Sequence, residues 1–199
     1  MIPRIEQKLE IDKSSYINII EWLKYKNAQI LYPERLVNSR YFDNYNLQMY
    51  YDTVEGLLPR KKIRLRTYNT REFELSDFPY SLEKKLTTEK KRYKSIEKNI
   101  EFKDNIYNQI YDEDYGLCFQ KVDISYVREY FLVNSIRMTI DKNIEYKDLI
   151  SSNIAKDESF VIEVKADIDN DLDFIANNFD FSRTRFSKYE RSFEYLSNI

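Results

Sequence analysis

Several segments of the chain alternate charged and apolar residues, which is the pattern of a β-strand with one ionic and one apolar face. Lys62, Arg64 and Arg66 would share one face of such a strand. Ile63 and Leu65 would share the other face. The same alternation recurs in the segments 4–10, 83–85, 126–130, 137–141 and 163–165.

This repeated pattern has two interpretations. If the ionic faces turn inward, a closed antiparallel sheet would enclose a cationic tunnel with a few carboxylates, which suits a chain of phosphates. The cations would then repel one another in the empty protein, so removing one should leave it as stable or more stable. The alternative is an ordinary antiparallel sheet whose ionic face is solvated, because such sheets commonly have one wet face.

The composition restricts the chemistry that the chain can perform. Of its 199 residues, 33% are charged, yet the net charge is only −2. No global basic field therefore draws the protein to nucleic acid, and we expect no nucleic-acid partner. The sequence contains no histidine, which excludes His-based acid–base catalysis, a serine triad and His-ligated zinc. The remaining Lys, Arg, Glu, Asp and Tyr side chains suit phosphoryl transfer, in which positioning and charge neutralisation do most of the work.

Rare residues and short segments exclude further classes of protein. Cys118 is the only cysteine, so a disulfide framework or a cysteine-rich metal cluster cannot form. Gly56 and Gly116 are the only glycines, which excludes a P-loop and a glycine-rich dinucleotide-binding turn. No apolar run reaches the roughly 18 residues that a membrane span needs. The N-terminal residues lack the apolar core of a signal peptide, and we expect a cytoplasmic protein without a membrane span.

The periodicity predicts an α+β fold built around antiparallel strands, in a single domain over residues 1–199. Helices are expected over 14–27, 95–113, 169–178 and 187–196. Strands are expected over 3–11, 37–43, 60–69, 80–87, 89–94, 121–133, 135–146 and 159–167, with a turn-rich stretch over 150–158.

Eight short motifs together resemble a known family. They are VNSRYFDN at 37–44, RKKIRLRTY at 60–68, SLEKK at 81–85, KKRYK at 90–94, SYVREYF at 125–131, IRMTID at 136–141, VIEVK at 161–165 and FSKYERSF at 186–193. In this order and spacing, the chain resembles the VTC-domain polyphosphate polymerases, a branch of the triphosphate tunnel (CYTH-like) enzymes. The resemblance runs from about Arg4 to about Phe193.

The resemblance implies an antiparallel β-barrel tunnel with peripheral helices. In such an enzyme the tunnel binds the triphosphate of ATP, and the terminal phosphoryl group passes to a growing inorganic polyphosphate chain. ATP and inorganic polyphosphate are therefore the expected partners, and Mn²⁺ or Mg²⁺ is the expected cofactor. By motif, the resemblance implies a catalytic set of Lys8, Arg64, Arg66, Lys85, Lys90, Tyr126, Arg128, Arg137, Ser187 and Lys188, of which Arg64, Arg66 and Lys188 would bind the nucleotide.

The implied roles agree with the chemistry of these side chains. Arginine offers a planar fork that binds phosphate oxygens bidentately, and lysine adds a point charge. The resemblance makes Glu163 the metal ligand, because Mg²⁺ and similar ions take one or two carboxylates plus phosphates. A salt bridge to a neighbouring cation is the alternative role for Glu163. Within KKRYK, the choice among Lys90, Lys91 and Lys94 stays open.

Two other functions stay open from the sequence. A metal-dependent triphosphatase or polyphosphatase would use water as the acceptor. A non-catalytic module would bind polyphosphate without turnover.

Overall fold

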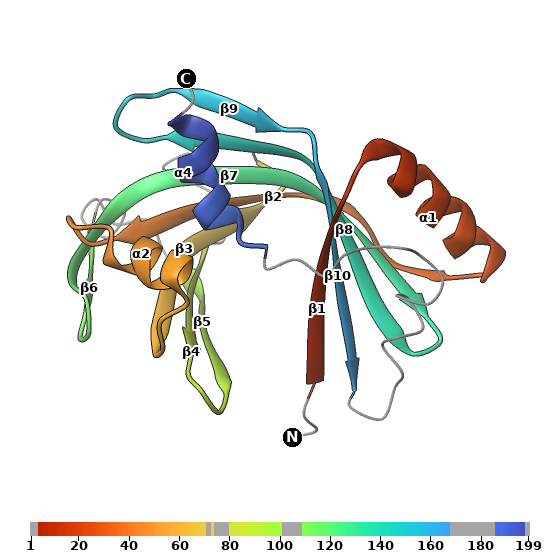
Figure 1. The fold of residues 1–199 in the computed structure, drawn as a ribbon, viewed down its shortest axis with the longest axis horizontal. Coiled ribbons are helices and arrows are strands. Elements are labelled where there is room, and N and C mark those ends of the chain that lie inside the picture. Colours follow the sequence, from red (N-terminus) through yellow and green to blue (C-terminus); the bar gives the residue numbers. More distant parts are fainter. Residues whose placement is uncertain (1–3, 71–72, 74–79, 101–108, 168–185, 198–199) are drawn as a thin grey trace. The chain divides into compact units, whose positions relative to one another are not determined.

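The structure, a computed structural model, describes residues 4–70, 73, 80–100, 109–167 and 186–197 (Figure 1). The helices in this part of the chain are α1 (Lys13–Tyr25), α2 (Gln48–Glu55) and α4 (Lys188–Leu196). The strands are β1 (Arg4–Ile11), β2 (Gln29–Asp43), β3 (Arg60–Tyr68), β4 (Tyr80–Thr87), β5 (Arg92–Ile100), β6 (Gln109–Asp112), β7 (Gly116–Val133), β8 (Ile136–Asp148), β9 (Ile154–Asp157) and β10 (Phe160–Asp167).

The strands hydrogen-bond to one another in the order β1-β10-β8-β7-β2-β3-β4-β5, while β6 pairs with β7 and β9 pairs with β8. The β1–β10, β10–β8, β2–β3, β3–β4, β4–β5 and β6–β7 pairs are all antiparallel. The α+β fold around antiparallel strands that the sequence predicts is therefore confirmed.

The chain forms two compact units. Unit 1 comprises Met1–Arg35, Tyr126–Ile144 and Asp157–Phe186, and unit 2 comprises Leu36–Ser125, Glu145–Lys156 and Ser187–Ile199. Strands β2, β7, β8 and β9 contribute residues to both units. We describe each unit by itself.

The core of unit 1 lies between α1 and the strands β1, β8 and β10 (Figure 1). Asp12 caps α1, because its carboxylate accepts a 2.7 Å hydrogen bond from the backbone N–H of Ser15. The helix turns Ile19 and Leu23 inward, where they pack with apolar residues of the three strands. The strand residues in this core include Leu9, Ile11, Met138, Ile140, Ile162 and Val164.

The core of unit 2 gathers on one face of β3. Ile63 and Leu65 are fully buried there with Phe42 of β2 and Met49 of α2. The alternation predicted from the sequence is confirmed in both units, because apolar residues of one strand parity form the core. The charged residues of the other parity lie on the opposite face.

The helix predicted over 95–113 is wrong. Residues 95–100 belong to strand β5, residues 109–112 form strand β6, and 101–108 lie outside the described residues. Ile96, which a helix here would need to bury, is 46% exposed. Pairing with β4 over eight positions decides the structure of β5 instead. The helix predicted over 169–178 lies outside the described residues.

Helix α2 has no counterpart in the sequence-based prediction, because its N-terminus has an unusual cap. Leu47 precedes it in a left-handed conformation and makes no side-chain cap. The Asp43 carboxylate at the end of β2 accepts hydrogen bonds from the backbone N–H groups of Met49 and Tyr50 instead, at 3.0 and 2.9 Å. Of the helices described, none is long and apolar enough to cross a membrane.

Candidate functional site

The ionic face of β3, β4 and β5 in unit 2 carries a row of three lysines. Lys62 on β3 lies directly opposite Lys85 on β4, and Lys85 lies directly opposite Lys94 on β5. Like charges directly opposite on adjacent strands destabilise a sheet. An anion over the row would offset this repulsion, so the row is a candidate anion-binding surface.

Two arginines and a carboxylate lie beside this row. Glu83 on β4 is directly opposite Arg64 on β3 and is only 5% exposed. Its Oε2 atom accepts a 2.7 Å hydrogen bond from Arg64 Nε and lies 3.6 Å from Arg66 Nη1. Its Oε1 atom accepts a 2.8 Å hydrogen bond from Lys94 Nζ. Burial raises the pKa of Glu83, but the charges of Arg64 and Arg66 and the contact with Lys94 outweigh it and lower the pKa to about 2.

Tyr41 on β2 adds a phenol to the same cluster. Its hydroxyl oxygen accepts a 2.8 Å hydrogen bond from Arg64 Nη1, and the ring is buried. Burial acts to raise the pKa of Tyr41, yet the charges of Arg64, Arg66 and Lys188 lower it overall. A phenol held among cations can donate its proton in a hydrogen bond to a phosphate oxygen.

The start of α4 lies on this side of unit 2. Ser187 caps the helix by accepting the backbone N–H of Glu190 at 3.3 Å. The same hydroxyl accepts a 2.7 Å hydrogen bond from Lys62 Nζ, so the helix N-terminus and the lysine row meet at Ser187. Lys188 is the first residue of the helix. A helix N-terminus next to ammonium groups favours an anion.

Among the three lysines that the sequence leaves open, the structure brings Lys94 to the cluster. Lys90 and Lys91 are exposed and lie in the turn between β4 and β5. That turn is closed by a 2.9 Å hydrogen bond from the backbone N–H of Thr88 to the carbonyl of Lys91. Lys90 therefore stands apart from Glu83, whereas the Lys94 ammonium contacts it.

Unit 1 holds a second ionic cluster, on β1, β8 and β10. Glu163 on β10 lies opposite Lys8 on β1 and opposite Thr139 on β8. Its carboxylate is 2.6 Å from Lys165 Nζ and 3.8 Å from Arg128 Nη2. Burial acts to raise the pKa of Glu163, but the charges of Lys8, Lys165 and Arg128 hold it well below the usual range. Glu163 is thus ionised and surrounded by cations, as both of its predicted roles require.

The other predicted site residues of unit 1 differ in their contacts. Arg128 binds Asp141 through Nε and Nη2, at 2.5 and 2.8 Å. Its guanidinium lies 5.2 Å from the ring centroid of the buried Tyr126. Lys8 Nζ donates a 3.4 Å hydrogen bond to the carbonyl of Phe186. Arg137 is exposed on β8.

The donor set around Glu163 fits a hard divalent cation. The described residues contain no group of three or more His, Cys, Asp or Glu arranged to hold a metal. Mg²⁺ needs only one or two protein carboxylates, since phosphates and water complete its shell. The Thr139 hydroxyl, opposite Glu163, is buried and has no hydrogen-bond partner among the described residues. One carboxylate with an unsatisfied hydroxyl beside it suits Mg²⁺ or Mn²⁺ bound largely by a phosphate ligand.

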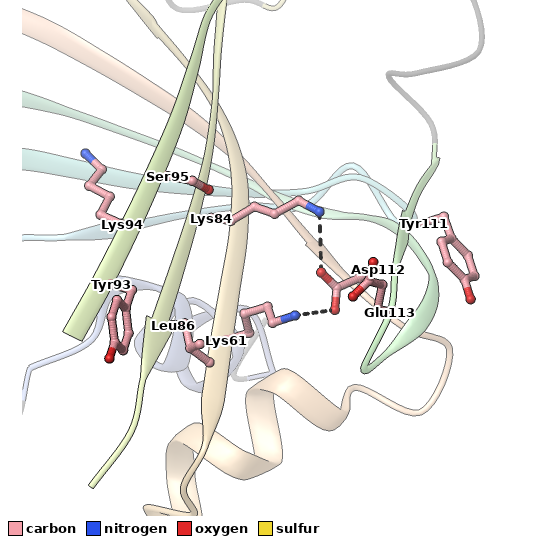
Figure 2. Close-up of a pocket in the computed structure, with 9 residues that line it drawn as sticks. All are labelled: Lys61, Lys84, Leu86, Tyr93, Lys94, Ser95, Tyr111, Asp112 and Glu113. Atoms are coloured by element: carbon pink, nitrogen blue, oxygen red, sulfur yellow. Dashed lines mark hydrogen bonds and ion pairs between the residues drawn. The ribbon is translucent and has the colours of Figure 1, made fainter. Parts of the chain in front are cut away.

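A pocket lies on the opposite face of β3 and β4, and of the two clusters only Lys94 reaches it (Figure 2). Lys61 and Lys84 point into it, and both contact Asp112 of β6, at 2.7 and 3.4 Å. Lys94 lines its edge, but Figure 2 shows that the Lys94 side chain points away from Asp112. Of the residues that line this pocket, Lys94 also belongs to the Glu83 cluster, and the other eight are not predicted site residues.

The sequence-based set misses Glu83 and Tyr41. The alternation in the segment 83–85 already places Glu83 on the ionic face with Lys85, but nothing in the sequence gives it a role in the site. Tyr41 lies beside Phe42 in the mixed segment 37–44, where its residue type alone does not distinguish it from a core aromatic.

Comparison with known proteins gives one family and one fold. The family model for the VTC domain matches residues 3–118. A solved structure of a candidate adenylate cyclase from Vibrio parahaemolyticus is similar, with a TM-score of 0.52 and 14% sequence identity. The likeness covers 94% of this chain and 95% of that chain, and it shows the triphosphate tunnel fold that the sequence predicts. Among curated proteins, none matches the sequence.

Proposed function

Because this chain belongs to the VTC-domain family, we propose that it is a polyphosphate polymerase. It transfers the terminal phosphoryl group of ATP to a growing inorganic polyphosphate chain. The observation that carries this proposal is the lysine row of Lys62, Lys85 and Lys94, which faces the same side as Arg64 and Arg66. Five cations share one face of three strands, and a chain of phosphates would supply the negative charge that neutralises them.

The side chains of unit 2 suit positioning and charge stabilisation. Arg64 and Arg66 neutralise charge that develops on the transferred phosphoryl group, and the lysine row neutralises the phosphates that flank it. Ser187 and the N-terminus of α4 add hydrogen-bond donors. A general base is unnecessary, because a terminal phosphate of the acceptor chain is already anionic.

The cluster in unit 1 supports a metal requirement. Glu163 would hold Mn²⁺ or Mg²⁺, with the Thr139 hydroxyl beside it. Such an ion, when bound, supplies charge neutralisation and orientation of the phosphate oxygens that it contacts. The charges of Lys8, Lys165 and Arg128 hold the pKa of Glu163 well below its usual range, so its carboxylate is ionised; a bound metal ion would replace its 2.6 Å contact with Lys165.

Analysis of the products of ATP tests the proposal. The protein is incubated with ATP and Mn²⁺, and the mixture is assayed for polyphosphate on a stained gel and for ADP, free phosphate, cyclic AMP and pyrophosphate. The proposal expects polyphosphate and ADP, and it expects neither without metal. Free phosphate without polymer would identify a triphosphatase, and binding without turnover would identify a polyphosphate-binding module. Cyclic AMP with pyrophosphate would identify the activity that is named for the Vibrio protein.

A further inference from the structure

Glu83 connects the cations of three strands. It belongs to the central strand of the three, β4, and contacts cations of both neighbours. Its Oε2 atom faces Arg64 and Arg66 of β3, and its Oε1 atom faces Lys94 of β5. One carboxylate therefore fixes the positions of three charged groups that the family resemblance or the geometry assigns to phosphate binding.

The exposure of these side chains shows which of them a ligand meets first. The Glu83 side chain is 6% exposed, whereas the Arg64 side chain is 24% exposed and the Lys94 side chain is 42% exposed. The carboxylate thus lies beneath the cations. An anion that arrives from solvent contacts Arg64 and Lys94 without first displacing Glu83.

Arg64 is held from two sides. Its Nε and Nη2 atoms bind Glu83, and its Nη1 atom donates to the Tyr41 hydroxyl. A free arginine side chain loses considerable rotamer entropy when it binds a ligand. Because these contacts already fix the guanidinium plane, the ordering cost is met on folding rather than on phosphate binding.

We propose that Glu83 is a positioning residue that orients Arg64, Arg66 and Lys94 for a phosphate chain. This inference rests on the proposed function and adds a role for a carboxylate in a site defined by cations. A simpler electrostatic view predicts the opposite sign, because removing a negative charge next to the cations should strengthen anion binding. The sign of the affinity change therefore distinguishes positioning from charge competition.

Calorimetric titration of the full chain with tripolyphosphate, in the absence of metal, measures this sign. We expect Glu83→Gln to weaken tripolyphosphate binding by about tenfold, because the Arg64 guanidinium would no longer be held in the orientation that binds two phosphate oxygens. The matched control is Asp112→Asn, which removes one buried carboxylate that also contacts two lysines but lies on the opposite face. We expect this control to bind within about twofold of wild type, since screening limits a distant charge.

Two further variants separate positioning from damage to the fold. Glu83→Asp keeps the negative charge but shortens the side chain, so its carboxylate no longer reaches the cations in the same way. This variant should weaken tripolyphosphate binding although the net charge of the site is unchanged. In an Arg64→Ala background, Glu83→Gln should cause much less additional loss than it causes in wild type, because its main effect passes through Arg64. Melting curves of each variant establish that it is folded.

The outcomes identify which statement fails. If Glu83→Gln is folded and binds tripolyphosphate as tightly as wild type or more tightly, the positioning role is wrong. If Glu83→Gln does not fold, Glu83→Asp decides, and unchanged binding by that variant also overturns the positioning role. Failure of wild type to bind tripolyphosphate would contradict the proposed function instead.

Discussion

The Tyr189 hydroxyl donates a 2.8 Å hydrogen bond to the Asp43 carboxylate, and both side chains are buried. This contact joins the first turn of α4 to the end of β2. Tyr189 also stacks on Tyr41, with ring centroids 5.1 Å apart. The residues that precede Tyr189 in the chain, Ser187 and Lys188, are thus held next to the ionic face of unit 2.

Tyr189→Phe should therefore destabilise the protein. Loss of the hydroxyl leaves the buried Asp43 carboxylate with one donor fewer, which costs about 1–2 kcal/mol in the free energy of unfolding. Urea denaturation followed by circular dichroism measures this difference. Tyr51→Phe is the matched control, because Tyr51 is 52% exposed, and its free energy of unfolding should stay within about 0.5 kcal/mol of wild type. Equal stability of Tyr189→Phe and wild type would contradict the assigned role.

Arg66→Ala should also destabilise the empty protein. The sequence alone suggests the reverse, because converging cations would repel one another. In the structure Arg66 is 6% exposed, lies 3.6 Å from Glu83 and donates to Ser39 Oγ at 3.1 Å. Removing it weakens the compensation of a buried carboxylate, so we expect a loss of about 2 kcal/mol in the same denaturation assay. Lys91→Ala, in the exposed β4–β5 turn, is the control and should change little.

The pH dependence of stability should contain a contribution from Glu83. Its pKa is about 2 in the folded protein and near 4.5 when unperturbed. Its stabilising contribution is therefore complete above about pH 4.5 and is lost as the pH falls towards 2, by an amount on the order of 3 kcal/mol. Glu83→Gln should flatten the stability curve relative to wild type between these pH values. Parallel curves in thermal melts from pH 2 to 6 would contradict this assignment.

We expect the activity to require the planar guanidinium of Arg64 and not only its positive charge. Arg64→Ala should lower the rate of polyphosphate synthesis by a factor on the order of 10² or more, because transition-state charge loses its partner. Arg64→Lys should recover only part of this rate, since an ammonium lacks the planar pair of parallel N–H donors that a guanidinium presents to two phosphate oxygens. Full activity of the Lys variant would indicate a general electrostatic field instead.

Glu163→Gln should raise the Mn²⁺ concentration needed for half-maximal synthesis, because an amide is a weaker ligand for hard cations than a carboxylate. Thr139→Val should shift the metal dependence in the same direction by less, since it removes one neutral oxygen. Electron paramagnetic resonance of Mn²⁺ with the protein and tripolyphosphate measures metal binding apart from turnover. Wild-type metal affinity in Glu163→Gln would assign Glu163 to salt bridges with Lys165 and Arg128 alone.

The sequence predicts the features that depend on strand periodicity. Alternation assigns Ile63 and Leu65 to the core and places Arg64 on the ionic face, because a strand has only two faces. It fails where long-range contacts decide the structure. Ile96 lies in a strand because β5 pairs with β4, and α2 begins where Asp43 caps it from the preceding strand.

The site residues also divide into those that the sequence identifies and those that only long-range contacts reveal. The cations of the motifs are recognisable from their residue types, whereas Glu83 and Tyr41 gain their significance from neighbours on other strands. Their contacts with Arg64 depend on the register of β2, β3 and β4, which the sequence does not specify.

The most direct test of the proposed activity is the stoichiometry of ATP turnover with Mn²⁺. ATP labelled in its γ-phosphate is incubated with the protein, and ADP, labelled free phosphate and labelled polymer are quantified over time. A polyphosphate polymerase predicts one labelled phosphate in polymer for each ADP formed, with little free phosphate. Equal amounts of ADP and free phosphate, with no labelled polymer, would contradict the account.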